Sequence, residues 1–332
     1  MTGPSELPTQ AREDPDGDRR LMETVEELLT EARGSAVVRW LRRSPCPFTT
    51  LWPTEIIDIE LEDCERLSLF AKRLGIDEGG HPDKRRPDRE LLAYKRLLGE
   101  PGIAAPRYYG TRLHEESGQA ELYLEYIADW DLRYQGLGQW MEAAGALARL
   151  HRAFAGQVDE EDFLLSLDRE YVIAWAERAA TALERGPAGL GRRLESLLAA
   201  HAPVAELLAA QPRTLVHNDL APKNVLADRS RTPARICLVD WEVAGAGCGL
   251  LDLVHLGYGL DEREGQRLLA AYLGGLEDAP LLPASPSELE RVLAAARLHK
   301  ALYRLAHSHL WRDDPALAEE WVAEAEHARA VV

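Results

Sequence analysis

The chain has 332 residues, of which 46% are hydrophobic and 29% charged, a composition typical of a globular protein with about two domains. Lysine and arginine number 39 against 56 aspartate and glutamate residues, so the formal net charge is −17. This acidity argues against nucleic acid or an anionic membrane as the partner, because clustered basic residues bind phosphate groups. It is equally compatible with attraction of a cationic substrate and with a role in solubility alone.

Cysteine usage and hydropathy bear on the compartment. The four cysteines are widely scattered and form no C-x-x-C pair, so neither a zinc site nor a disulfide framework is predicted. No apolar run reaches the roughly 18 residues of a membrane span, and the acidic, proline-rich start is unlike a signal peptide. We therefore expect a soluble, cytoplasmic protein.

The first part of the chain is predicted to form a tail and a small β-sheet lobe. Residues 1–20 are rich in proline, glycine and charge, which is typical of a disordered tail. Apolar residues at helical spacing predict a helix over 21–33 that ends at Gly34. Apolar or alternating segments then predict strands. These cover residues 36–41, 55–61, 66–74, 106–110 and 121–127.

Two charged features of this predicted lobe are a lysine on the third strand and a basic stretch before the next helix. Lys72 lies on the third strand, on the face opposite Leu67, Leu69 and Ala71. After it, Pro87 and Asp88 begin a helix, in keeping with the preference of proline for the first helical turn. The basic stretch 84–89 before this helix is interrupted by aspartates, and a solvated loop is favoured over a nucleic-acid patch.

From residue 128 onward the pattern becomes mostly helical. Long helices are predicted around 140–151, 160–184 and 190–210. His151 lies on an apolar stripe and is interpreted as a core histidine. Ser285 to Glu288 fits a capping box that opens a further helix near the end of the chain.

The stretch 215–240 interrupts the predicted helices and contains the candidate catalytic and metal-binding residues. The apolar pair Leu215-Val216 predicts a short strand that ends at His217. Asp219 and Asn224 follow, five residues apart, in a proline-containing loop. Two short strands are predicted next, and the second ends on Asp240. Oxygen-bearing side chains thus lie at the ends of adjacent strands, which suits Mg²⁺ because this ion prefers oxygen ligands. In phosphoryl transfer, Asp219 would orient and deprotonate the acceptor hydroxyl, while Asn224 and Asp240 hold the metal.

The pattern H-x-D-x-x-x-x-N, followed by Asp240-Trp241-Glu242, resembles the aminoglycoside phosphotransferase and choline kinase branch of the protein-kinase-like fold. The resemblance covers most of the chain from about residue 36. It implies an α+β, two-lobed fold. A small N-terminal lobe over 21–127 would hold an antiparallel sheet and one key helix, and a larger, mostly helical C-terminal lobe would cover 128–332.

The same resemblance implies ATP as the phosphate donor. Lys72 would hold its phosphates, and Glu90 on the following helix would position Lys72. The strand end from Glu125 to Ile127 would be the hinge that bonds adenine. Residues 44–50, which would cover the phosphates, depart from the protein-kinase pattern because they contain no glycine.

Two further residues receive supporting roles from the resemblance. His217 would support the catalytic loop by hydrogen bonding. Asp252, at the family's interval from Asp240, would brace that loop rather than take part in the chemistry.

The predicted function is an ATP- and Mg²⁺-dependent phosphotransferase that acts on a hydroxyl of a small molecule. The first choice of acceptor is a cationic aminoglycoside or amino-sugar antibiotic, which would imply antibiotic resistance. A metabolic kinase for choline, a sugar or an amino alcohol is the alternative, and a catalytically silent kinase-like binding module is a third. No motif indicates an oligomeric state.

Overall fold

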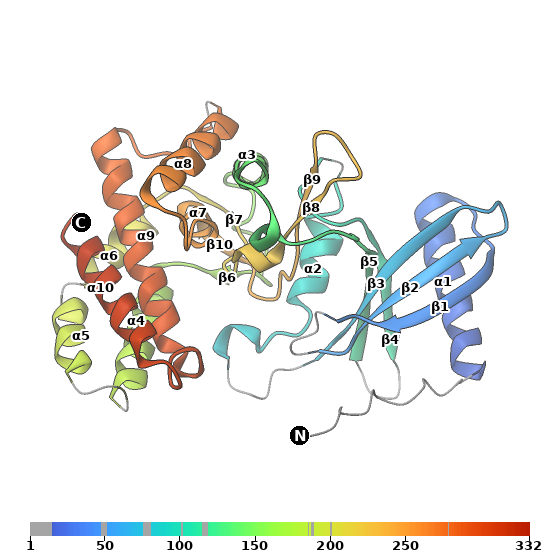
Figure 1. Cartoon of the computed structure of the whole chain (residues 1–332), viewed down its shortest axis with the longest axis horizontal. Helices are drawn as coiled ribbons and strands as arrows, with labels where there is room; N and C mark the ends of the chain where they lie inside the picture. The colour runs from blue at the N-terminus through green and yellow to red at the C-terminus, as the bar shows by residue number, and fades with distance from the viewer. Residues whose placement is uncertain are drawn as a thin grey trace, which may run out of the picture. The chain divides into compact units, whose positions relative to one another are not determined.

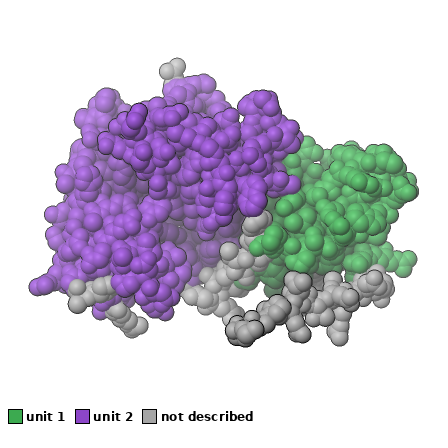
Figure 2. Space-filling view, in the orientation of Figure 1, with its two compact units in different colours: residues 1–75, 107–126 green, residues 76–106, 127–332 purple. Residues whose placement is uncertain are grey.

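The computed structural model describes residues 15–47, 52–75, 81–100, 102–114, 119–184, 186, 189–199, 201–277 and 279–332. The chain forms two compact units, coloured green and purple in Figure 2. Unit 1 combines residues 1–75 with 107–126, and unit 2 combines 76–106 with 127–332. Residues 76–106, which the sequence analysis places in the small lobe, therefore belong with unit 2.

Unit 1 is built on a five-stranded antiparallel sheet with the order β1-β2-β3-β5-β4. Each predicted strand occurs; the third has the predicted bounds, and the other four have shifted ends. The strands are β1 (Val38–Pro45), β2 (Thr54–Leu61), β3 (Arg66–Leu74), β4 (Tyr108–His114) and β5 (Gln119–Glu125). The expected phosphate-covering turn at 44–50 includes residues 48–50, which lie outside the described part of the chain.

Helix α1 (Pro15–Arg33) supplies one side of the core of unit 1. Leu21, Val25 and Leu29 recur at helical spacing and pack with Leu69 and Ala71 of β3. Because side chains alternate along a strand, Lys72 points away from this core. The helix begins at Pro15, so the end of the expected disordered tail is helical; residues 1–14 lie outside the described residues.

Unit 2 is mostly helical, as Figure 1 shows. Its helices are α2 (Arg89–Arg96), α3 (Leu137–Ala153), α4 (Arg169–Leu183), α5 (Leu190–Ala199), α6 (His201–Ala209), α7 (Leu250–Leu256), α8 (Glu262–Leu276), α9 (Pro286–Ala306) and α10 (Pro315–Arg329). Helix α9 begins with the predicted cap, in which the Ser285 side chain accepts a hydrogen bond from the Glu288 main-chain nitrogen. It packs against α4, α7 and α10 and forms the centre of the helical core. None of the helices in the described ranges combines the length and the apolar character needed to cross a membrane.

Short strands and turns interrupt the helices and position the functional residues. Strands β6 (Leu165–Ser166), β10 (Gly245–Cys248) and β7 (Arg213–Val216) form one sheet in that order. Strands β8 (Val225–Asp228) and β9 (Arg235–Leu238) form a separate antiparallel hairpin. The single-turn helices are η1 (Pro82–Lys84), η2 (Leu132–Tyr134), η3 (Pro222–Asn224) and η4 (Ser308–Leu310). The loop after β7 therefore carries His217 and Asp219, and the end of β9 leads to Asp240.

Candidate active site

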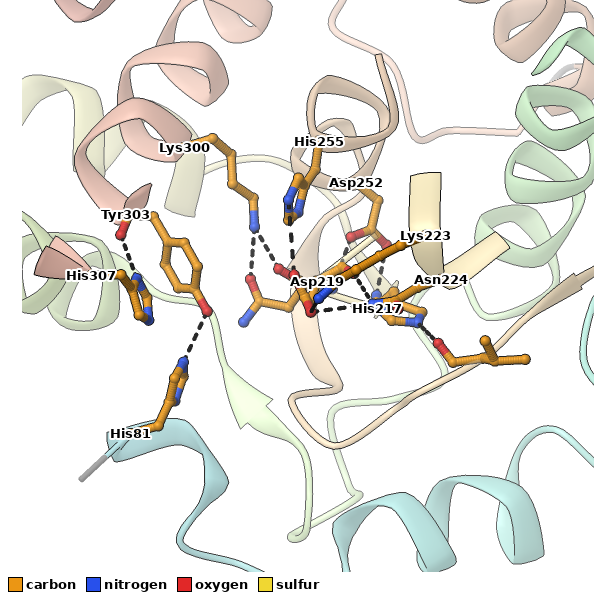
Figure 3. Close-up of polar contacts among 12 residues, drawn as sticks. His81, His217, Asp219, Lys223, Asn224, Asp252, His255, Lys300, Tyr303 and His307 are labelled. Carbon is orange, nitrogen blue, oxygen red and sulfur yellow. Dashed lines mark hydrogen bonds and ion pairs between the residues drawn. The ribbon is translucent and has the colours of Figure 1, made fainter. Parts of the chain in front are cut away.

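The buried carboxylate of Asp252 accepts hydrogen bonds from the main chain of the loop after β7. The main-chain nitrogens of His217 and Asn218 donate hydrogen bonds of 2.6 and 2.8 Å to the two carboxylate oxygens of Asp252. Burial by itself would raise the pKa of Asp252, but the hydrogen bond from His151 and nearby positive charge outweigh it, so the pKa is lowered. Asp252 is therefore an ionised brace for the loop, which confirms the role predicted for it (Figure 3).

His151 is fully buried, as predicted for a core histidine. Its Nδ1 lies 2.8 Å from the Tyr272 hydroxyl, and its Nε2 lies 3.4 Å from Asp252. Both ring nitrogens thus have partners inside the protein. This histidine therefore supports Asp252 from within the core.

His217 links the loop to the strand end that precedes Asp240. Its Nε2 lies 2.8 Å from the main-chain oxygen of Val239, and its ring packs 4.5 Å from the ring of Trp241. The Val239 nitrogen in turn donates to the main-chain oxygen of Asn224 at 3.0 Å. These contacts agree with a supporting role for His217, which remains a proposal.

Asp219 and Asn224 lie together on this loop. The Asn224 side-chain nitrogen donates to the main-chain oxygen of Asp219 at 2.8 Å and to its carboxylate at 3.2 Å. Two basic side chains approach the same carboxylate, Lys223 at 3.7 Å and His255 at 3.9 Å. Asp219 is partly exposed, with 27% of its side chain accessible.

Asp240 adopts a φ of 70°, a conformation that non-glycine residues rarely adopt and that is often found at functional sites. One carboxylate oxygen each from Glu90, Asp240 and Glu242 lies within 4.8 Å of the others. These carboxylates supply the hard oxygen ligands that Mg²⁺ prefers. Asn224 is joined to the residue before Asp240 by the main-chain hydrogen bond from Val239. The residues present therefore fit the predicted metal.

The predicted nucleotide-binding residues are divided between the two units. Lys72 belongs to unit 1, where its side chain is 7% exposed and its backbone pairs with Thr54 and Leu122. Glu90 belongs to unit 2, on the buried side of α2. Their predicted pairing stays a prediction, whereas the proximity of Glu90 to Asp240 was not predicted.

The predicted hinge covers the place where the chain passes from unit 1 to unit 2. Glu125 ends β5, and its main-chain nitrogen donates to the Arg107 oxygen at 2.9 Å. Ile127 is buried in unit 2. Their role in adenine binding remains a prediction.

The basic stretch before α2 is not the solvated loop that was expected. Arg89 is only 5% exposed and donates to main-chain oxygens, including those of Phe163 and Glu242 at 2.9 Å. The Lys84 ammonium lies 2.7 Å from the Glu242 carboxylate. The expectation is wrong for these two residues because their acceptors come from segments distant in sequence, which local charge patterning does not reveal.

Lys300 of α9 is a further functional residue that sequence reasoning missed. Its side chain is 1% exposed, and its ammonium donates to the main-chain and side-chain oxygens of Asn218. Burial lowers the pKa of Lys300 to about 8. The available signal was weak: a lysine at a position where the helical spacing places apolar residues.

The fold is similar to that of solved small-molecule kinases. Choline kinase LicA from Streptococcus pneumoniae is 14% identical, with 94% of this chain and 100% of that chain covered and a TM-score of 0.56. A microcompartment-associated aminopropanol kinase is 18% identical, with 90% and 94% covered and a TM-score of 0.57. Macrolide 2'-phosphotransferase MphH from Brachybacterium faecium is 16% identical, with 91% and 98% covered and a TM-score of 0.56. At these identities the likeness establishes the fold, and it confirms the predicted two-lobed, kinase-like class.

The fold and the braced Asp219 loop define a kinase-like phosphotransferase. Residues 76–290 match the model of the phosphotransferase enzyme family. The chain belongs to this family, which confirms the predicted resemblance, and the protein is an enzyme that transfers phosphoryl groups. No curated protein matches the sequence.

Proposed function

We propose that the enzyme transfers the γ-phosphate of ATP to a hydroxyl group of a small, cationic molecule, with Mg²⁺ as cofactor. The observation that carries this proposal is the loop on which Asp219 and Asn224 are hydrogen-bonded together. This loop is connected through Val239 to the strand end that bears Asp240. Phosphoryl transfer depends mainly on positioning and charge neutralisation, so such a braced set of oxygen groups supports it.

Each residue has a definite task in this reaction. Asp219 accepts a hydrogen bond from the acceptor hydroxyl and orients it toward the phosphate. Because the pKa of an alcohol is far above that of a carboxyl group, Asp219 receives the proton only late, as the new bond forms. Its main contribution is therefore orientation, which the contact with Asn224 maintains.

The cofactors are assigned to the remaining predicted residues. Asn224 and Asp240 would hold Mg²⁺, which when bound neutralises phosphate charge. Lys72 would bind the nucleotide phosphates, Glu90 would assist Lys72, and the segment from Glu125 to Ile127 would bind adenine. A structure of LicA in complex with AMP supports nucleotide binding by this fold.

The acceptor class rests on charge and on the aromatic residues in unit 2. An aminoglycoside or amino-sugar antibiotic remains the first candidate, in keeping with the net charge of −17. Rings of His81, Trp175, Tyr303 and His307 cluster with centroids 4.4 to 6.4 Å apart. Asp219 is close enough to raise the pKa of Tyr303, although burial is the larger cause.

An amino alcohol is the second candidate. In this ring cluster Arg178 already lies over Trp175 and Lys300 over Tyr303. The partly exposed rings of His81 and His307 are the ones that would contact an ammonium group, of a compact amine or of an amino sugar. Two structural neighbours, a choline kinase and an aminopropanol kinase, also favour this class. The first candidate implies antibiotic resistance and the second a metabolic role.

Incubation of the purified protein with ATP, Mg²⁺ and a panel of aminoglycosides, amino alcohols and uncharged sugars tests the proposal. Mass spectrometry should reveal a phosphorylated product for at least one cationic acceptor. Asp219→Asn should reduce turnover by about 10²- to 10⁴-fold and leave ATP affinity nearly unchanged. Nucleotide binding with no product from any acceptor would instead indicate a silent binding module, and full turnover by Asp219→Asn would refute the role of this carboxylate.

A further inference from the structure

Lys84 lies beside the group of carboxylates formed by Glu90, Asp240 and Glu242, although it precedes the helix that carries Glu90. It ends the single-turn helix η1, which begins after His81. Its ammonium contacts the Glu242 carboxylate at 2.7 Å, and 25% of its side chain remains accessible. The lysine therefore points toward the carboxylates of the site and can still reach a ligand.

The electrostatic surroundings keep Lys84 positively charged. Burial disfavours its charged form, but the adjacent Glu242 carboxylate outweighs this effect, so the pKa of Lys84 is raised. The charges of Asp240 and Asp219 act in the same direction. Lys84 thus interacts with the proposed metal ligand and with the proposed acceptor-binding carboxylate as well as with its direct partner.

Buried contacts anchor the turn that presents Lys84. The neighbouring Asp83 is 4% exposed and accepts a hydrogen bond of 2.7 Å from the Tyr171 hydroxyl of α4. Arg89 donates to the main-chain oxygen of Asp83 and, at 2.9 Å, to that of Glu242. The turn is consequently attached on one side to the helical core and on the other to the segment after Asp240.

The same anchor also serves the catalytic loop. The Tyr171 hydroxyl accepts a hydrogen bond of 2.7 Å from the side chain of Asn218, the residue before Asp219. One hydroxyl group therefore connects the turn bearing Lys84 with the loop bearing Asp219. This shared hydrogen-bond partner fixes the position of the turn relative to the loop. A lysine on a loop without such a partner would not be positioned in this way.

We propose that Lys84 binds the phosphoryl group of the nucleotide while it is transferred. This inference rests on the proposed function. A terminal phosphate entering among Glu90, Asp240 and Glu242 would meet negative charge, and the Lys84 ammonium can exchange its contact with Glu242 for a phosphate oxygen. In the transfer, the bond from the terminal phosphorus to the bridging oxygen of the nucleotide breaks and the bond to the acceptor oxygen forms. The acceptor proton goes to Asp219, whereas Lys84 keeps its protons and stabilises charge through hydrogen bonds.

Lys84→Met tests this role, with Lys95→Met as the matched control. Lys95 is an exposed lysine on α2 in the same unit. Lys84→Met should lower kcat/KM by about 10²-fold. In the presence of Mg²⁺ it should weaken binding of a non-hydrolysable ATP analogue about tenfold, a loss of about 1.4 kcal/mol, and leave ADP affinity nearly unchanged, because ADP lacks the terminal phosphate. Lys84→Arg should recover part of the loss, and Lys95→Met should match the wild type.

Equal weakening of the ATP analogue and of ADP, or unchanged kinetics and affinities, would overturn the inference and leave Lys84 as a structural partner of Glu242. If Lys84→Met melts well below the wild type, Lys84→Gln provides the same comparison, since it keeps a hydrogen-bond donor for Glu242 without the charge. Failure of the proposed function is distinguished by the wild type itself, which would then form no product with any acceptor. A wild type that is active, with Lys84→Met equally active, refutes the role of Lys84 alone.

Discussion

Lys300 donates a hydrogen bond of 2.7 Å to the main-chain oxygen of Asn218, the residue that precedes Asp219. The same ammonium lies 3.1 Å from the side-chain oxygen of Asn218. Asn218 has a φ of 68°, which is unfavourable for a residue with a side chain, and its nitrogen is held by Asp252. A lysine of α9 therefore helps to maintain the backbone conformation from which Asp219 projects.

Lys300→Met should impair the reaction more than nucleotide binding. Methionine fills a similar volume but leaves two buried oxygens of Asn218 without this donor, so the loop is expected to relax. A small displacement of Asp219 would lower kcat roughly 10- to 10²-fold, with little change in affinity for an ATP analogue. Steady-state kinetics and a binding titration measure the two quantities. Arg297→Met, at an exposed position of the same helix, is the control, and an unaltered kcat in Lys300→Met would refute the positioning role.

Asp240→Asn should make nucleotide affinity almost independent of Mg²⁺. The substitution removes a carboxylate charge from the group formed with Glu90 and Glu242. We expect the affinity for an ATP analogue to fall about tenfold or more in Mg²⁺, which corresponds to about 1.4 kcal/mol. Titrations with Mg²⁺ and with a chelator measure the difference, and the two proteins should agree in the chelator. Undiminished affinity in Mg²⁺ would contradict the assignment of Asp240 as a metal ligand.

His299 should make the wild type sensitive to mild acid. It is fully buried, and desolvation, with a smaller effect of the Lys300 charge, lowers its pKa well below 6.5. Below this pH the unfolded chain binds a proton that the folded protein does not, so the free energy of unfolding falls as the pH falls. Relative to His299→Leu, the wild type should lose up to about 1.4 kcal/mol per pH unit below pH 6.5.

Denaturant unfolding of both proteins between neutral and mildly acidic pH measures this dependence. His309→Leu, at an exposed histidine, should follow the wild type. A constant difference between His299→Leu and the wild type across the pH range would show that burial of this imidazole does not shift its protonation.

Two adjacent glycines in α8 should respond to alanine in opposite directions. A Cβ at Gly275 would lie 2.8 Å from the Ala148 Cβ and 2.9 Å from the main-chain oxygen of Gly145, both on α3. Nothing lies within 4 Å of a Cβ at Gly274. Gly275→Ala should destabilise the protein by about 1–3 kcal/mol through overpacking, whereas Gly274→Ala should stabilise it by about 0.5–1 kcal/mol through helix propensity. Thermal unfolding of the pair tests the close approach of α3 and α8, and equal effects would argue against it.

Local patterns were sufficient for the sheet of unit 1 and for the loop after β7. The alternation along β3 predicted that Leu69 and Ala71 face a core, and they do so against α1. The spacing from Asp219 to Asn224 predicted two oxygen groups on one loop, because the proline at 222 excludes a continuous helix there. In each case the residues that determine the outcome are neighbours in sequence.

Contacts between distant segments were not predictable in the same way. Nothing near Lys84 indicates Glu242 as its partner, and nothing near Lys300 indicates Asn218. The prediction that 76–106 belongs to the small lobe followed the order of the chain. In the structure, Arg89 of this segment donates hydrogen bonds to the main-chain oxygens of Phe163 and Glu242, which belong to unit 2. Charge density alone does not distinguish a buried guanidinium from a solvated one.

The amino-acid sequence by itself determined the strand and helix types, indicated the kinase-like class through a family resemblance, and predicted Asp219, Asn224 and Asp240 as site residues. The strand and helix types depend on periodicity and turn chemistry within a few residues, which any stretch of chain expresses locally. Only the tertiary structure decided that Lys84 faces the carboxylates and that Lys300 supports the loop before Asp219. Ion pairs and buried hydrogen bonds form between groups that the packing of the helices brings within about 3 Å of one another. These distances are set by the folded core and not by neighbours in sequence.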